Sequence, residues 1–244
     1  MTPAMFIDRL AGLELPATFN PWHDRCAEFD RSDAAARRRR NLQNMLEAAI
    51  DHGAETMWIA RDLGYRGGRR TGIPLTDEVH LRDAAALMGD IKLEKATQGP
   101  VVAERTAAVV WQVLRSISSP VVLWNVFPYH PHEEGKSMSN RCHTRAERKM
   151  TWSLLEDLIA MINPREIIAI GRDAQMALSA LDKNVIPIRH PSYGGQREFI
   201  SGIHHFYGLT ESQGTQSQDQ QLALEAYAAS ANCCLLYTSP SPRD

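Results

Sequence analysis

The sequence has few cysteines, and none of them has the spacing of a metal or redox site. Its four cysteines stand at positions 26, 142, 233 and 234, and no Cys-x-x-Cys pair occurs in the 244 residues. This pattern excludes a thioredoxin-like redox motif and a zinc ribbon. Unpaired cysteines of this kind are typical of a reduced chain, and we therefore expect a cytoplasmic protein.

Long hydrophobic runs and an excess of charge of one sign are also lacking. No apolar run approaches the roughly 20 residues that span a bilayer, and no basic segment followed by an apolar core opens the chain. We expect neither a membrane partner nor a secretory signal. The formal net charge is −2, so any contact with nucleic acid must come from local patches. The remaining composition, 43% hydrophobic and 23% charged, is typical of a soluble globular protein.

Three motifs of common α/β enzymes do not occur in this sequence. They are the phosphate-binding GxxxxGK[ST], the dinucleotide-binding GxGxxG after a strand, and the Gly-x-Ser-x-Gly nucleophile elbow. Their absence weighs against a nucleotide or small-molecule hydrolase of an unrelated α/β fold, although that alternative stays open at this point.

What the sequence does contain is four short apolar runs, rich in valine and isoleucine, separated by segments of helical periodicity. The runs cover residues 56–60, 121–126, 166–170 and 185–188. Helices are predicted at 33–52, 101–118, 144–162 and 172–181, the third with Thr144 and Glu147 as a capping box. Because the runs do not alternate strictly, they indicate strands buried on both faces. The sequence predicts a three-layer α/β/α fold with a central, mainly parallel four-stranded sheet.

The C-terminal part of the chain differs in composition from the rest. Residues 211–221 are rich in glutamine and serine and indicate a flexible linker, and a short helical pattern follows at 222–229. Residues 234–244 (CLLYTSPSPRD) resemble the translated read-through of a sequencing adapter. We therefore expect one α/β domain over 1–210, a linker with a short helix over 211–233, and a non-native segment from 234 onward.

Polar side chains follow three of the predicted strands. Asp62 lies in the loop after the first strand, Asn125 ends the second, and His190 follows the fourth. Ligands of open parallel sheets bind outside the carboxyl ends of the strands. We therefore expect these three side chains to face one hollow.

The order of these residues resembles the motifs of the uracil-DNA glycosylase superfamily. In that family a first motif follows strand one, an Asn ends the second strand, and a His-Pro-Ser motif leads into a loop that enters the DNA minor groove. Here residues 60–64 (ARDLG), Asn125 and residues 190–192 (HPS) stand at these places, and 168–171 (IAIG) resembles the family's third strand. The likeness extends over residues 20–205.

Several positions depart from the family pattern. Ala60 and Leu63 replace the usual Gly and Pro of the first motif, and Gly64 stands where some members use a Tyr to exclude 5-methyl bases. An aromatic residue normally stacks on the extruded base, whereas Leu75, Ile73 or Tyr65 would have to serve here. Two cysteines in the body of the chain are too few for the family's iron–sulfur cluster, so no metal or other cofactor is expected.

The resemblance implies a DNA glycosylase that removes a deaminated base, with uracil as the first candidate. Cleavage of the glycosidic bond builds positive charge on the sugar and negative charge on the base. Asp62 would stabilise the sugar cation or activate water, and His190, as a neutral imidazole, would stabilise the departing base. Asn125 offers donors and an acceptor in one plane and would read the base edge. No Lys stands in these loops to form a Schiff base, which predicts a monofunctional hydrolase.

The base must leave the duplex stack before it reaches such a site. The loop after His190 is predicted to contact DNA, with Tyr193 as the foremost wedge candidate. The expected DNA contacts are Ser192, Tyr193, Gly194, Gln196 and Arg197, together with Arg69 and Arg70 on phosphates. For the two arginines a merely solvated role is an equal alternative.

The partner implied is DNA that contains a deaminated base, bound by a monomer in the cytoplasm or nucleoid of a prokaryote, or encoded by a phage. A second alternative keeps the same fold without activity. Such a protein would only bind uracil-containing or abasic DNA.

Overall fold

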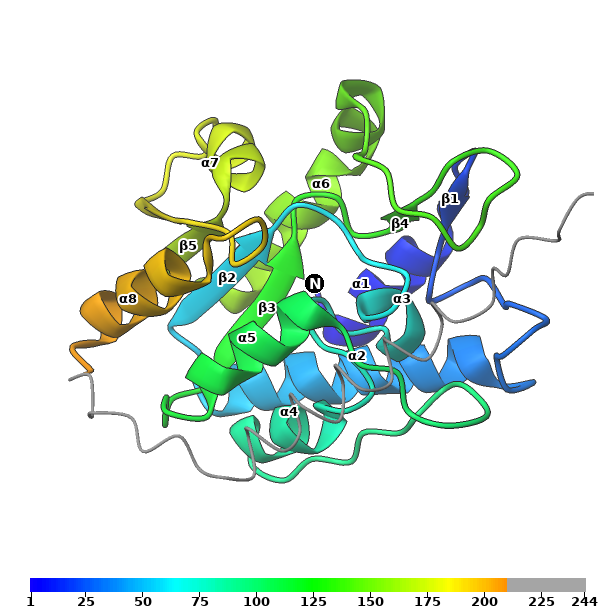
Figure 1. The fold of residues 1–244 in the computed structure, drawn as a ribbon, viewed down its shortest axis with the longest axis horizontal. Coiled ribbons are helices and arrows are strands. Elements are labelled where there is room, and N and C mark those ends of the chain that lie inside the picture. The colour runs from blue at the N-terminus through cyan, green and yellow to red at the C-terminus, as the bar shows by residue number, and fades with distance from the viewer. Residues whose placement is uncertain (210–244) are drawn as a thin grey trace, which may run out of the picture. The chain divides into compact units, whose positions relative to one another are not determined.

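The computed structural model describes residues 1–209, of which Met1–Tyr207 form one compact unit built around a parallel sheet (Figure 1). The predicted linker and short helix at 211–233 and the adapter-like segment at 234–244 lie outside the described residues. No helix in residues 1–209 is long and apolar enough to span a bilayer.

The central sheet has the four strands that the apolar runs predicted. The strands are β2 (Thr56–Ala60), β3 (Val121–Asn125), β5 (Glu166–Ile170) and β6 (Val185–Ile188). Their order is β3-β2-β5-β6, and every neighbouring pair is parallel. Every residue of β2 and β3 is buried, which explains why these strands show no alternation of polar and apolar residues.

Helices cover both faces of this sheet, which confirms the three-layer α/β/α prediction. One layer holds α1 (Pro3–Ala11), α2 (Ala34–Asp51) and α6 (Arg145–Ile162), which contact one another. The other layer holds α5 (Arg105–Leu114) and α8 (Gln196–Tyr207), which also contact each other. In Figure 1, α5 and α8 lie in front of the strands and α6 lies behind them.

Local signals explain where the helices begin. Thr144 accepts the backbone N–H of Glu147, whose carboxylate accepts the N–H of Thr144, so the predicted capping box is present. At α1, which the sequence pattern did not predict, Thr2 caps the first turn and Pro3 occupies a position that needs no N–H donor. The predicted helix at 101–118 is shorter than expected, because α5 begins only at Arg105.

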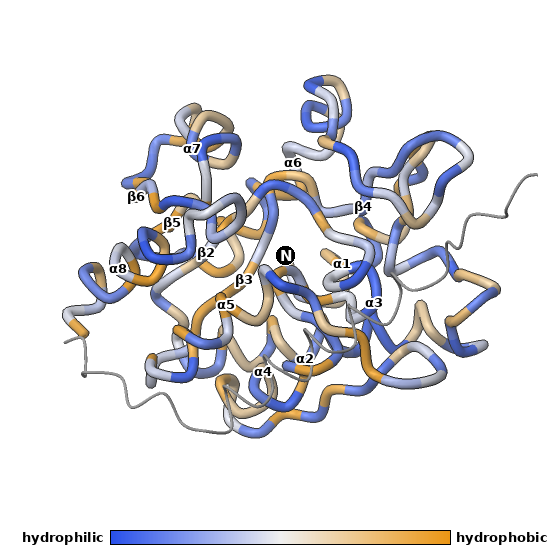
Figure 2. The backbone as a smooth tube through the Cα atoms, in the orientation of Figure 1, coloured by the Kyte–Doolittle hydropathy of each residue, from blue (hydrophilic) through white to orange (hydrophobic). Residues whose placement is uncertain are grey.

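Short elements surround the layers. They are α3 (Gly68–Thr71), α4 (Leu81–Leu87), α7 (Arg172–Leu178) and an antiparallel pair of β1 (Thr18–Phe19) with β4 (His130–Pro131). The core between sheet and helices includes the fully buried rings of Trp58 and Trp124. Figure 2 shows hydrophobic residues along the strands and along parts of α5 and α8.

The connections diverge at one point of the sheet. The chain leaves β2 towards β3 on one side, whereas it leaves the adjacent β5 towards β6 on the other side. Loops that diverge from neighbouring parallel strands leave a crevice at the carboxyl edge, where ligands of open α/β sheets bind. The topology therefore places a site between the loops that follow β2 and β5.

Candidate active site

A hollow of about 330 Å³ lies at this place. The end of β2 and the loop after it line the hollow from Ala60 to Gly64, and the end of β5 and the start of α7 line it from Ile170 to Asp173. Six of the residues that line it were candidates from the sequence: Asp62, Gly64, Leu75, His190, Ser192 and Tyr193. Its volume lies at the lower end of the range typical of small-ligand pockets.

Asp62 is held by two neighbours that contact the same carboxylate oxygen. Its Oδ2 lies 2.9 Å from Nε of Arg61 and 3.3 Å from Nδ1 of His143, and the side chain is 9% exposed. No described residue hydrogen-bonds to Oδ1 of this carboxylate. Burial lowers the pKa of Arg61, but Asp62 and Asp173 outweigh this effect and raise that pKa above its ordinary value. Arg61 is thus a permanent cation that fixes one oxygen and leaves the other free.

His143 was not found by sequence analysis. It precedes α6 and meets Asp62 across 81 positions of sequence, while its ring stacks on Phe127 at 5.2 Å between centroids. The sequence carries no signal for this contact, because it arises only when the loop after β2 and the segment before α6 are packed together. A polar residue next to a capping box is otherwise unremarkable.

His190 has its tautomer set by the residue two positions further on. Its Nδ1 accepts the backbone N–H of Ser192 at 3.1 Å and lies 2.7 Å from the Ser192 hydroxyl oxygen. Because a backbone N–H can only donate, the proton of the neutral ring resides on Nε2. Burial, followed by the charges of Arg61 and Arg189, lowers the pKa of His190 below its ordinary value. At neutral pH the residue is therefore an uncharged imidazole with Nε2–H as its donor.

Asn125 ends β3 beside Ala60 of β2 and is 1% exposed. Neither its amide nitrogen nor its carbonyl oxygen has a hydrogen-bond partner among the described residues. A buried, unsatisfied amide costs about 1–3 kcal/mol, so its retention calls for a reason such as a ligand. Asn125 is not one of the residues that line the hollow, so the expectation that three side chains face it holds only for Asp62 and His190.

The other expected base contacts divide into two groups. Gly64 and Leu75 line the hollow. Leu75 is 8% exposed, and its backbone is left-handed with φ of 56°. Tyr65 does not line it: its backbone N–H donates to Asn140, and its ring lies 6.5 Å from that of His130. Leu75 is thus better placed than Tyr65 to meet a bound base.

The loop after His190 presents one large side chain. Tyr193 is 97% exposed and holds a left-handed backbone with φ of 51°, and Gly194 follows with φ of 80°. Gln196 and Arg197 are exposed but begin α8, so they belong to a helix and not to this loop.

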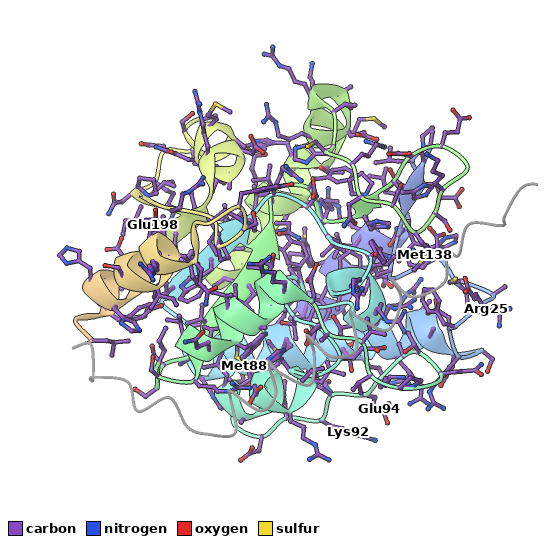
Figure 3. The ribbon with its side chains drawn as sticks, in the orientation of Figure 1. Arg25, Met88, Lys92, Glu94, Met138 and Glu198 are labelled. Carbon is purple, nitrogen blue, oxygen red and sulfur yellow. The ribbon has the colours of Figure 1, made fainter. Side chains whose placement is uncertain are left out.

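Arg69 and Arg70 require a correction, because the structure buries them at 1% and 6% exposure. The Arg69 guanidinium lies over the ring of Phe19 at 4.1 Å, and that of Arg70 lies over Phe29 at 4.2 Å. Arg70 also pairs with Glu78 at 3.3 Å. Arg69 further donates to the carbonyl of Ser137 beside Met138, which Figure 3 labels. Both arginines hold loops to the body of the molecule, and neither is placed to contact phosphates.

This combination of a four-stranded parallel sheet with an acid, an amide and a histidine after its strands is that of a DNA glycosylase-type protein. The chain belongs to the uracil-DNA glycosylase superfamily, whose sequence profile matches residues 36–206. Among solved structures, wild-type SMUG2 of Pedobacter heparinus is similar with a TM-score of 0.58 and 14% identity, over 87% of this chain and 100% of that one. At this identity the likeness shows a shared fold. None of the curated proteins matches this chain.

Proposed function

We propose that this protein is a monofunctional DNA glycosylase that hydrolyses the N-glycosidic bond of a deaminated base, with uracil as the first candidate. Membership of the superfamily supports glycosylase-type chemistry on DNA. The observation that carries the proposal is that Asp62 and His190, which follow different strands, line one hollow at the carboxyl edge of the sheet.

Asp62 is the group that meets the sugar and the attacking water. Arg61 and His143 both contact Oδ2, so Oδ1 is left to accept a proton from water or to stabilise the sugar cation. A positioned general base contributes about 10²–10⁴-fold to a rate.

His190 acts on the departing base. Ser192 occupies Nδ1, so the Nε2–H donor is available to an oxygen of the base as negative charge develops there. A donor aimed at such an oxygen is worth about 3–4 kcal/mol of transition-state stabilisation. The neutral imidazole of His190 already carries the Nε2 proton, so it can donate this hydrogen bond at neutral pH.

Asn125 is assigned to read the base: it does not line the hollow itself, but it pairs with Ala60, which does. The loop after His190 controls access. The unsatisfied amide of Asn125 has the donors and the acceptor that match a base with a carbonyl beside an N–H. Tyr193 is exposed enough to enter the gap that a flipped nucleotide leaves. None of the residues lining the hollow is a Lys, which favours attack by water over a Schiff base.

A panel of oligonucleotides tests this function. Each contains uracil, hypoxanthine, xanthine or a mismatched thymine, and alkali reveals the abasic sites that the protein leaves. We expect release of at least one base, and loss of that release by about 10²–10⁴-fold in Asp62→Asn. Asp51→Asn, an exposed change at the end of α2, is the matched control. Binding of damaged DNA without release of any base would indicate the inactive DNA-binding alternative.

A further inference from the structure

A second carboxyl group lies in the same hollow. Glu104 is half-buried at the N-terminal end of α5, where its backbone N–H donates to Oδ2 of Asp77 at 2.6 Å. Residues at this position commonly cap the helix with their side chain, but the carboxyl group of Glu104 makes no such bond. It lines the hollow together with Asp62 and His190.

Two glycines make room for this carboxyl group. A Cβ atom at Gly64 would lie 2.2 Å from Oε1 of Glu104, and one at Gly67 would lie 2.0 Å from Oε2. Both distances are far below van der Waals contact. The loop after β2 therefore forms a cradle around Glu104 that any other residue at positions 64 or 67 would fill.

The carboxyl group has no ion-pair or hydrogen-bond partner among the side chains and backbone of residues 1–209. Burial and the neighbouring Asp77 raise the pKa of Glu104 to about 7, while Arg66 acts in the opposite direction. Asp77 itself contacts His80 at 2.6 Å. The other charged or titratable side chains that line the hollow are Arg61, Asp62, Arg172, Asp173, Arg189, His190 and Tyr193.

Glu104 and His190 reach the hollow from segments that adjoin different strands. Glu104 begins the helix that leads into β3, and His190 follows β6, while β3 and β6 are the two outer strands. A base bound in the hollow would thus meet two donors from separate segments. Deamination replaces an amino donor of a base by a carbonyl acceptor, and two donors suit such a base.

We propose that Glu104 is a further catalytic residue, a general acid whose carboxyl proton passes to the departing base. This proposal rests on the proposed glycosidase function. The C1′–N bond breaks with its electron pair going to the base, and the Glu104 proton goes to a nitrogen or oxygen of that base. A water oxygen bonds to C1′, and its proton goes to the Asp62 carboxylate. Proton exchange through solvent then restores the protonated Glu104 and the ionised Asp62.

Single-turnover base release across a range of pH tests this role. For the natural protein we expect the rate to decline above pH about 7, tenfold for each pH unit, because ionised Glu104 has no proton to give. Glu104→Gln and Glu104→Ala are each expected to be about 10²-fold slower at pH about 6 and to lack this decline. Glu134→Gln, an exposed change in the loop after β4, is the matched control and should retain both rate and profile.

A binding experiment separates failure of this proposal from failure of the proposed function. Free uracil and free hypoxanthine are titrated into each protein by calorimetry. We expect the natural protein to bind one of them about tenfold more tightly at pH about 6 than at pH about 8.5, and Glu104→Gln to show no such difference. Base release by both Glu104 variants at the natural rate and with the natural pH profile would overturn the role of Glu104 while leaving the glycosidase function intact. Absence of release by the natural protein would overturn the function, and pH-independent binding would then also exclude Glu104 from base contact.

Discussion

Nδ1 of His143 lies 3.3 Å from Oδ2 of Asp62, the same oxygen that Arg61 contacts at 2.9 Å. The carboxylate is thereby held from two directions at one oxygen, which orients the other oxygen. The ring of His143 is itself fixed by stacking on Phe127. His143 is therefore a positioning residue for the proposed general base.

Replacement of His143 is expected to slow base release without weakening DNA binding. A small misplacement of a catalytic group costs up to about 10²-fold in rate, so His143→Ala and His143→Phe should each be about 10–100-fold slower. His143→Phe keeps a ring for stacking and removes both ring nitrogens, including the Nδ1 that contacts Asp62. His205→Ala, an exposed change on α8, is the control. Equal single-turnover rates for the natural protein and both variants would show that His143 does not position Asp62.

Tyr193 is predicted to lower the free energy of unfolding through its backbone conformation and to speed base release from duplex DNA. Its left-handed backbone costs a non-glycine residue about 1 kcal/mol, so Tyr193→Gly should raise the free energy of unfolding by up to that amount. The same variant should release base more slowly from duplex than from single-stranded DNA, because only the duplex must be held open. Denaturant unfolding and paired duplex and single-strand assays measure the two effects. Tyr193→Phe should behave like the natural protein, and a loss of stability in Tyr193→Gly would contradict this account.

His130 makes the fold sensitive to acid. Burial, followed by the charge of Arg69, lowers the pKa of His130 from 6.5 to about 4. As the pH falls below 6.5, His130 takes up a proton in the unfolded chain before it does so in the folded protein. The contribution of neutral His130 to the free energy of unfolding is therefore fully present above pH about 6.5. It falls by about 1.4 kcal/mol per pH unit down to pH about 4.

The variant His130→Gln isolates this contribution. Between pH about 7 and 5 the natural protein should lose about 2 kcal/mol more than the variant in urea-unfolding experiments. The change in each protein is compared with its own value at neutral pH, so any loss of packing in the variant cancels. Parallel pH curves for the two proteins would show that His130 does not carry the acid sensitivity.

Replacement of Arg69 by alanine should affect stability, whereas replacement of Arg197 by alanine should affect DNA binding. Arg69→Ala removes a buried guanidinium that lies over Phe19 and bonds to Ser137, and it should destabilise the fold by about 2–4 kcal/mol. Arg197→Ala changes an exposed position on α8 and should leave stability unchanged. As a proposed phosphate contact, Arg197 should on removal reduce the slope of log affinity against log salt by about one. A salt slope altered equally by both variants would show that Arg69 also reaches DNA.

The strands were predictable because burial on both faces requires a short run of consecutive apolar residues, which can be seen in the local sequence. The runs of valine and isoleucine gave β2, β5 and β6 with their observed bounds, and β3 ended one residue earlier than predicted. The capping box at Thr144 is equally local, since both of its bonds join residues three positions apart. Asp62 and His190 could be placed in the hollow because the carboxyl ends of parallel strands share one edge.

The tertiary structure alone decided which polar side chains face that hollow. Arg69 and Arg70 are as polar in sequence as Arg197, yet aromatic rings 40 to 50 positions away cover them. His143 and Glu104 belong to segments that reach the loop after β2 only through packing of α6 and α5 against the sheet, and Tyr65 turns away from a site that its neighbours line. A short sequence pattern records whether a residue is buried in its own strand or helix. The direction of a loop side chain depends on contacts between distant segments, and those form only when the whole domain folds.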